Sequence, residues 1–208
     1  MRRFLSILYL FILTGSCVCA RAQEADVYLD NIIEQFQQSK GITADFALQG
    51  EANSGLYMKG TLKMQGKRFY ISTNDLTTWY DGKTMWTYAP GIGEVNITTP
   101  TRQELAEVNP YMLLDDYKQS FIVKELNCEQ KGERQFRLTP TKRNTPIMQV
   151  VLTVATASKA PISFEITDNN NRKMLIAVTN YNDKVSLPAS TFMFDSTQYP
   201  KAIVIDLR

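Results

Sequence analysis

The chain has 208 residues, and its 23 Lys and Arg against 21 Asp and Glu give a formal net charge of +2. It contains no histidine, which excludes Ser-His-Asp and Cys-His catalysis, histidine metal sites and histidine acid–base chemistry. It also has no Gly-rich phosphate-binding loop, so no nucleotide site is expected.

The first residues are typical of a secretory signal peptide. Arg2 and Arg3 form a basic start, and residues 4–13 are an apolar run too short to span a bilayer comfortably. Ala20-Arg21-Ala22 matches a small-x-small cleavage site. Residues 1–22 are therefore predicted to be a signal peptide, and its removal leaves 20 basic and 21 acidic residues, a net charge of 20 − 21 = −1. The basic character thus belongs to the precursor and does not favour nucleic-acid binding.

A lipid anchor is the alternative for this end of the chain. Thr14-Gly15-Ser16-Cys17 is a loose match to a lipoprotein processing site, in which Cys17 becomes the lipidated first residue. Soluble export is favoured because an aliphatic residue is usual where Thr14 stands. Cleavage after Ala22 would leave Cys128 as the one remaining cysteine, which excludes an internal disulfide and is typical of a small, half-buried side chain.

The first element predicted after the signal peptide is a helix from about Ala25 to Lys40. Its apolar residues recur at helical spacing and form one stripe, and Gly41 is a C-terminal stop signal. A helix with one apolar stripe must pack against something larger. The stripe consists of Leu29, Ile32, Ile33 and Phe36.

Most of the remaining chain alternates apolar and polar residues with a period of two. This pattern predicts a long antiparallel meander with one apolar face, interrupted by turns rich in Gly, Pro, Asn and Asp. No linker or repeat divides it, so residues 23–208 are expected to form one domain. The alternating pairs include Phe46 and Leu48, Leu62 and Met64, Phe69 and Ile71, Val95 and Ile97, Phe136 and Leu138, Phe164 and Ile166, Ile176 and Val178, and Phe192 and Phe194.

Aromatic residues are densest between Thr73 and Tyr88. Two β-rich runs flank Asp81-Gly82, a dipeptide that tolerates the positive φ of tight hairpin turns. Both tryptophans of the chain, Trp79 and Trp86, lie on this hairpin. Its aromatic side chains must either be buried in a core or face an apolar ligand.

The middle of the chain predicts two short helices. Thr101 and Glu104 form a capping box before residues 102–108, and Asn109 followed by Pro110 predicts a second start, with Tyr111, Leu114 and Tyr117 at spacing three. Three helices beside about ten strands indicate an α+β fold. Such helices would cover a wide apolar face only in part, which favours a hollow for an apolar ligand.

The order of motifs resembles the periplasmic outer-membrane lipoprotein carrier family, the LolA-like proteins. A Gly-x-Leu strand at Gly60 precedes the basic, aromatic strand Lys67-Arg68-Phe69. The hairpin Asp81-Gly82-Lys83-Thr84-Met85-Trp86-x-Tyr88-x-Pro90 follows and is the most specific part of the match, and a Phe-x-Phe strand comes near the end. The resemblance covers nearly all of residues 23–208.

The resemblance implies an unclosed antiparallel β half-barrel of about eleven strands with a three-helix lid. It implies a periplasmic monomer that takes acylated lipoproteins from an inner-membrane lipoprotein-releasing transporter. Such a protein shields their acyl chains in an apolar hollow and delivers them to an outer-membrane acceptor, without catalysis, cofactor, metal or nucleic acid. In family members an arginine between the second and third strands ties the lid to the barrel. The turn here lacks the usual Pro and is about one residue shorter; Arg68 is the candidate for that latch, with Lys67 as the alternative.

Residues that face the hollow are expected on the apolar face of the first strands, on the aromatic hairpin and on the helical insert. For each of them an ordinary core position is the competing interpretation. Carriage of another amphiphile, such as a glycolipid or sphingolipid, and a lipoprotein-sensing regulatory role are the competing functions. The candidate ligand-binding residues are Phe46, Leu48, Leu62, Met64, Phe69, Ile71, Trp79, Trp86, Tyr88, Val95, Ile97, Tyr111 and Leu114.

Overall fold

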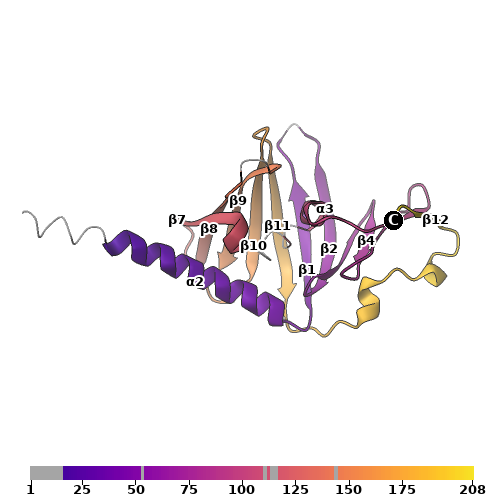
Figure 1. Ribbon diagram of the computed structural model, residues 1–208, viewed down its shortest axis with the longest axis horizontal. Coiled ribbons are helices and arrows are strands. Elements are labelled where there is room, and N and C mark those ends of the chain that lie inside the picture. The colour runs from indigo at the N-terminus through magenta and orange to yellow at the C-terminus, as the bar shows by residue number, and fades with distance from the viewer. Residues whose placement is uncertain (1–15, 53, 110–111, 113–116, 143–144) are drawn as a thin grey trace, which may run out of the picture.

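The fold was analysed in a computed structural model, which describes residues 16–208 except 53, 110–111, 113–116 and 143–144. Its main feature is one curved sheet of twelve strands (Figure 1). The strands are β1 (Ile42–Gln49), β2 (Tyr57–Gln65), β3 (Arg68–Thr73), β4 (Thr77–Tyr80), β5 (Met85–Ala89), β6 (Glu94–Thr98), β7 (Phe121–Leu126), β8 (Glu133–Pro140), β9 (Ile147–Ala155), β10 (Pro161–Asp168), β11 (Lys173–Asn182) and β12 (Ile203–Asp206).

The sheet is open, with β12 and β7 at its two edges. The strand order is β12-β6-β5-β4-β3-β2-β1-β11-β10-β9-β8-β7, and β1 lies between β2 and β11 in antiparallel register. The predicted unclosed, mostly antiparallel sheet is confirmed. A purely antiparallel sheet of about eleven strands is not, because β12 is a twelfth strand and runs parallel to β6. A long connection precedes β12, and long connections permit parallel pairing where tight hairpins do not.

Register assigns every side chain of the sheet to one of two faces. Residues opposite one another in paired strands point to the same side, and neighbours along a strand point to opposite sides. The pairs Leu62–Ile71, Met64–Phe69 and Phe46–Val178 place these residues on one face, which we call the inner face. The same rule places Trp79 and its partner Trp86 on the outer face.

Helix α2 (Ser16–Gln38) lies across the inner face, along the half of the sheet that holds β7 to β11 (Figure 1). Leu29 and Ile32 are buried in the same apolar cluster as Phe136, Leu152 and Phe164. The predicted apolar stripe therefore packs as expected. The helix is described from Ser16, nine residues before the predicted start at Ala25, so it includes the predicted cleavage site.

The other two α-helices are short. Helix α3 (Arg102–Val108) begins with the predicted capping box, in which Thr101 accepts from the Glu104 amide and the Glu104 carboxylate accepts from the Thr101 amide. Helix α4 (Tyr117–Ser120) has four residues. The prediction of a three-helix lid is wrong: among the described residues only α2 is longer than seven residues, and short segments of this kind add little cover of their own. Most of the predicted second short helix lies outside the described residues.

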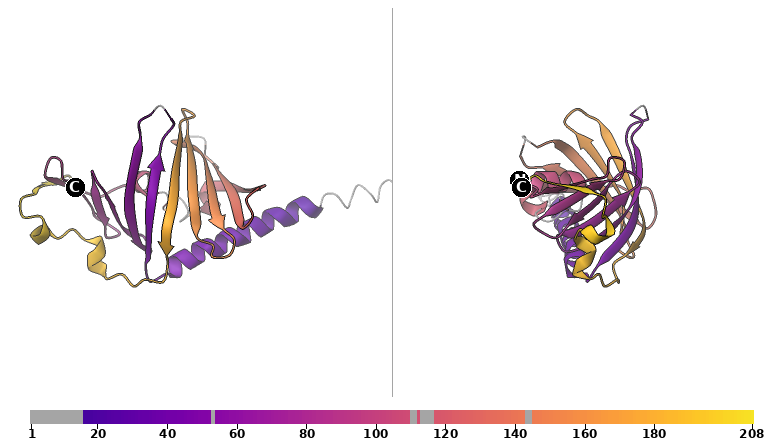
Figure 2. Two further views of the ribbon diagram at one scale, coloured as in Figure 1. Left: turned by 180° about the vertical axis from the view of Figure 1, so that it is seen from behind. Right: turned by 90° about the vertical axis from the view of Figure 1, so that its right-hand side faces the viewer.

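The last part of the chain crosses the outer face before it ends as β12. We call residues 183–208 the C-terminal segment; it includes two 3₁₀ turns, η2 (Ala189–Phe192) and η3 (Ser196–Gln198). Figure 2 shows it, in yellow, beside the strands of the β3–β6 half. The strand predicted at Phe192 and Phe194 is wrong. These residues dock against the face of the sheet, where no strand backbone is free to pair.

Candidate functional site

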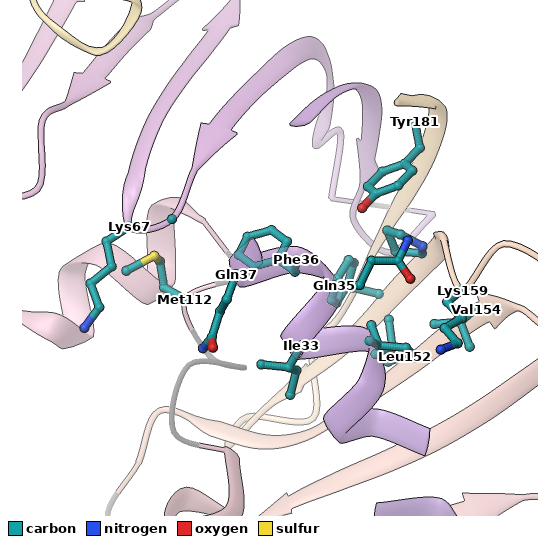
Figure 3. A pocket seen from close by; sticks show the side chains of 14 residues that line it. Ile33, Gln35, Phe36, Gln37, Lys67, Met112, Leu152, Val154, Lys159 and Tyr181 are labelled. Carbon is teal, nitrogen blue, oxygen red and sulfur yellow. The ribbon is translucent and has the colours of Figure 1, made fainter. Parts of the chain in front are cut away.

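An apolar cavity lies between the C-terminal half of α2 and the inner face of β9, β10 and β11 (Figure 3). The β2–β3 turn and Met112 complete its wall. Its volume is about 180 Å³. The lining residues are Ile32, Ile33, Gln35, Phe36, Gln37, Gly66, Lys67, Met112, Leu152, Val154, Lys159, Pro161, Phe164 and Tyr181.

Two periodicities in the sequence produce this apolar wall. Ile32, Ile33 and Phe36 face the sheet because residues three and four apart lie on one side of a helix. Leu152 and Val154 point to the same side of β9 because strand side chains alternate. The cavity exists where these two apolar surfaces meet without filling the space between them.

The size of the cavity limits what it holds in this conformation. An engineered cavity of about 150 Å³ accommodates one benzene molecule, so 180 Å³ has room for only a short piece of an acyl chain. A longer chain would require α2 to move away from the sheet. The contacts that hold α2 therefore decide how the cavity opens.

Arg134 on β8 makes a polar contact beneath the middle of α2. Its guanidinium donates to both carboxylate oxygens of Glu125 on β7, at 2.7 and 2.9 Å. The same group lies 3.9 Å from the ring centroid of Tyr28 on α2, and that ring stacks on Phe136 at 5.6 Å. A half-buried ion pair thus fixes a cation against an aromatic ring of the helix.

A second polar contact joins α2 to α4. Asp30 accepts from the Tyr117 hydroxyl at 2.8 Å and from the Lys118 ammonium at 2.7 Å. Burial raises the pKa of the Asp30 carboxyl, but the hydrogen bonds from Lys118 and Tyr117 and the charge of Lys118 outweigh it, so the net pKa lies below its usual value. The ionised carboxylate is the form that this contact stabilises.

The end of α2 nearest the cavity has its own polar contact. The Gln35 amide donates to the Asp183 carboxylate at 2.6 Å, just after β11. Burial, with a contribution from Asp183, raises the pKa of the Tyr181 phenol far above its usual value. The phenol is therefore protonated at neutral pH and available as a hydrogen-bond donor.

Six of the predicted ligand-binding residues lie on the inner face but beside the cavity rather than around it. Leu62, Met64 and Phe69 are buried members of the main apolar cluster, and Met64 accepts a hydrogen bond at 3.4 Å from the buried Asn109 after α3. Phe46, Leu48 and Ile71 are half-buried against the same cluster. The structure brings these six together as core on the β1–β3 side of the sheet.

Five others point to the outer face, away from α2 and the cavity. Register places Trp86 opposite Ile97 and Tyr88 opposite Val95. The outer aromatic cluster is completed by the C-terminal segment, where Tyr199 lies 5.6 Å from Trp79 and 4.7 Å from Tyr88, between ring centroids. This face of the aromatic hairpin is covered by the chain itself. Trp79, Trp86, Tyr88, Val95 and Ile97 make up the group.

The remaining predicted residues lie elsewhere. The Arg68 guanidinium stacks 5.3 Å from the ring centroid of Phe192, on the C-terminal segment rather than on α2. Arg134 has the contact with a helix that was predicted for Arg68. Its signal in the sequence was a cation in phase with Phe136 and Leu138 on an otherwise apolar strand face. Tyr111 and Leu114 lie outside the described residues.

The described part of the chain lacks a cluster of metal ligands and a membrane-spanning helix. No group of three or more Cys, Asp and Glu side chains there is placed to hold a metal ion. No helix among the described residues is both long and apolar enough to cross a membrane.

Solved structures share the fold at low sequence identity. An uncharacterised conserved protein from Thermus thermophilus superposes with a TM-score of 0.56 at 11% identity, over 85% of this chain and 98% of that one. A DUF1329 family protein from Desulfovibrio piger gives a TM-score of 0.50 at 12% identity, over 84% and 98% of the two chains. At these identities the likeness concerns the fold alone.

A comparison of sequences identifies the family. No protein of curated function matches the chain. The family model described as outer membrane lipoprotein carrier protein LolA matches residues 15–170, which is three quarters of the chain. The match includes α2, the sheet from β1 to β10 and most of the cavity wall. The chain therefore belongs to the LolA-like outer membrane lipoprotein carrier family.

Proposed function

We propose that this protein is a periplasmic carrier that shields the acyl chains of lipoproteins between α2 and the inner face of its sheet. Residues 1–22 would direct export, and residues 23–208 would be the carrier. The observation that carries the proposal is an apolar cavity between α2 and the inner face of the sheet, in a chain of the lipoprotein carrier family.

Burial of acyl chains would supply free energy toward the displacement of α2. Each buried methylene contributes about 0.8 kcal/mol, so ten methylenes contribute about 8 kcal/mol. The apolar side chains of α2 that line the cavity, among them Ile33 and Phe36, would be exposed by its displacement. An acyl chain in their place would restore the apolar contact on the sheet side.

Loading and release would then be exchanges between apolar sites. An inner-membrane lipoprotein-releasing transporter would hand over the acylated lipoprotein, and an outer-membrane acceptor with a competing apolar site would receive it. The protein would act as a monomer, catalyse no reaction and need no cofactor. Its binding free energy would come from burial alone, so the direction of transfer would depend on the two partners.

The test is the recovery of carrier–cargo complexes. The protein is produced together with an acylated lipoprotein, or with the same lipoprotein whose acylated cysteine is changed to serine, and complexes are identified by native mass spectrometry. Only the acylated form is expected to form a complex. Equal recovery of the two forms would mean that the acyl chains are not what is bound, and the proposal would fail.

A pair of variants on α2 tests whether the acyl chains bind in the cavity. Ile33→Glu puts a carboxylate into the apolar cavity and is expected to lower complex recovery by about tenfold or more, since burial of an unpaired charge is costly. Asn31→Glu adds the same charge on the exposed side of the same helix and should leave recovery unchanged. If both variants lose binding, charge on the helix rather than the cavity is responsible.

A further inference from the structure

Lys159 is an unusual residue for the edge of an apolar cavity. It lies in the turn between β9 and β10 and has a φ of 59°. This is the left-handed backbone region, which residues other than glycine seldom adopt. Its amide donates to the Ala155 carbonyl at 2.8 Å, which holds the turn in place. Although it lies at a turn, Lys159 is half-buried and lines the cavity.

The Lys159 ammonium faces apolar neighbours. Figure 3 shows its side chain beside Leu152 and Val154. Within the described part of the chain, the ammonium has no carboxylate partner, because the ion pairs found there involve other cations. A lysine at the edge of an apolar cavity can pack its aliphatic stem on that surface while its ammonium still lacks a charged partner within the protein. An anion from outside the chain would supply the missing partner.

Neutral hydrogen-bonding groups occupy the same side of the cavity. The labelled side chains of Tyr181 and Gln35 lie with Lys159 on one side in Figure 3, while Lys67 and Met112 lie on the other. Gln35 is already bonded to Asp183, whereas the Tyr181 hydroxyl donates to no acceptor among the described residues. The cavity therefore has an apolar interior and one side with a free cation and a free hydroxyl donor.

We propose that Lys159 and Tyr181 form a subsite for the anionic head group of an acyl amphiphile whose chain occupies the cavity. This inference rests on the proposed function, since it assumes that acyl chains enter there, and it adds a preference for a negative charge at the polar end. A carboxylate is the simplest group of this kind. It would accept from the Lys159 ammonium and the Tyr181 hydroxyl while its chain lies along Leu152, Val154 and Phe164.

Three single-chain amphiphiles of equal length test the head group. Binding of dodecanoate, dodecanol and dodecylamine to the purified protein is measured by titration calorimetry below their aggregation concentrations. Dodecanoate is expected to bind about tenfold more tightly than dodecanol, the effect of one charge-assisted hydrogen bond. Dodecylamine is expected to bind no more tightly than dodecanol, because its ammonium would face Lys159.

Variants test whether Lys159 and Tyr181 cause the preference for dodecanoate over dodecanol. Lys159→Gln should reduce the dodecanoate affinity to that of dodecanol measured on the same variant, and an unchanged unfolding midpoint in denaturant shows that the variant is folded. Tyr181→Phe should remove a smaller part of the preference. Lys173→Gln is the matched control, because Lys173 is an exposed lysine at the start of β11, beside the far end of β10 and away from the cavity.

The outcomes distinguish failure of the head-group subsite from failure of the proposed carrier function. Equal binding of dodecanoate and dodecanol would overturn the head-group subsite and leave the apolar carrier intact. A preference that survives in Lys159→Gln would overturn the assignment to Lys159. Failure of all three amphiphiles to bind would overturn acyl binding in this cavity, and the subsite with it.

Discussion

The two faces of the sheet differ in what covers them and in how completely. On the outer face, the C-terminal segment places Phe192, Phe194 and Tyr199 against the aromatic hairpin, and Phe192 is fully buried. On the inner face, α2 lies over strands whose buried side chains are mostly aliphatic, and it leaves a cavity. The densest aromatic cluster is on the face sealed by the chain itself, whereas the space for a ligand lies where a helix meets mostly aliphatic strands.

The difference follows from how the two covers are attached. The C-terminal segment continues directly from β11 and ends as a strand paired to β6, so both of its ends are held by sheet backbone. Among the described residues, helix α2 is joined to the sheet backbone only through β1. It is otherwise held by side chains, namely its buried apolar stripe and the polar contacts of Arg134, Asp30 and Gln35. Side-chain contacts can exchange with a ligand far more readily than a strand can be removed from a sheet.

Phe192→Ala is expected to have the largest effect. Removal of a fully buried phenylalanine costs about 3–5 kcal/mol of unfolding free energy, and Arg68 would lose the ring on which it stacks. Chemical denaturation measures the loss. Amphiphile binding under native conditions should be unchanged, and a parallel loss of binding would show that the two faces are coupled.

Ile33→Trp tests the cavity on the inner face by filling it with a larger side chain. The larger side chain would occupy the cavity, so dodecanol binding should weaken by about tenfold or more, while the unfolding free energy changes by less than about 1.5 kcal/mol because the space is already present. Titration and denaturation of the same sample measure both quantities. A variant that binds normally would place the acyl chain elsewhere.

Arg134→Met tests how much the side-chain contacts of Arg134 stabilise the packing of α2 on the sheet. The substitution removes the ion pair with Glu125 and the cation from the Tyr28 ring, and an expected loss of about 1–2 kcal/mol reflects a pair that is only partly buried. Amide hydrogen exchange should rise in α2 and stay constant in β3 to β6. Arg137→Met on the same strand, whose side chain points to the outer face, is the control.

Asp30→Asn is expected to have the smallest effect, and a pH-dependent one. Because the folded pKa of Asp30 lies below its usual 3.8, its contribution is fully present above the unfolded pKa and is lost as the pH falls through the folded pKa. At neutral pH the variant should lose about 0.5 kcal/mol, since the pair is exposed. The difference from the wild type should vanish as the pH falls below about 4. A difference that persists in acid would assign the effect to packing.

Sequence periodicity predicted most of the architecture and little of the cavity. Alternation located β1 to β6 and β8 to β11, and the stripe from Leu29 to Phe36 located the helix, because both patterns are local. Strands β7 and β12 were not predicted. The pairing of α2 with β9–β11 rather than with β2–β6 depends on how a long sheet curves, which no short stretch of sequence encodes. Trp79 and Trp86 were wrongly predicted to line the cavity. Alternation divides the residues of a strand between two faces of the sheet, but it does not indicate which face the helix covers.

The place of β1 in the sheet has a consequence for folding. Phe46 pairs with Gly60 on one side and with Val178 on the other, so the second contact closes a loop of 178 − 46 = 132 residues. Contacts this distant form slowly, and during synthesis the first six strands emerge long before their neighbours β11 and β12. Until those arrive, β1 and β6 are unpaired edges and the aromatic outer face is uncovered. A nascent chain in that condition is prone to aggregation, so the last thirty or so residues complete a surface that the first hundred cannot protect by themselves.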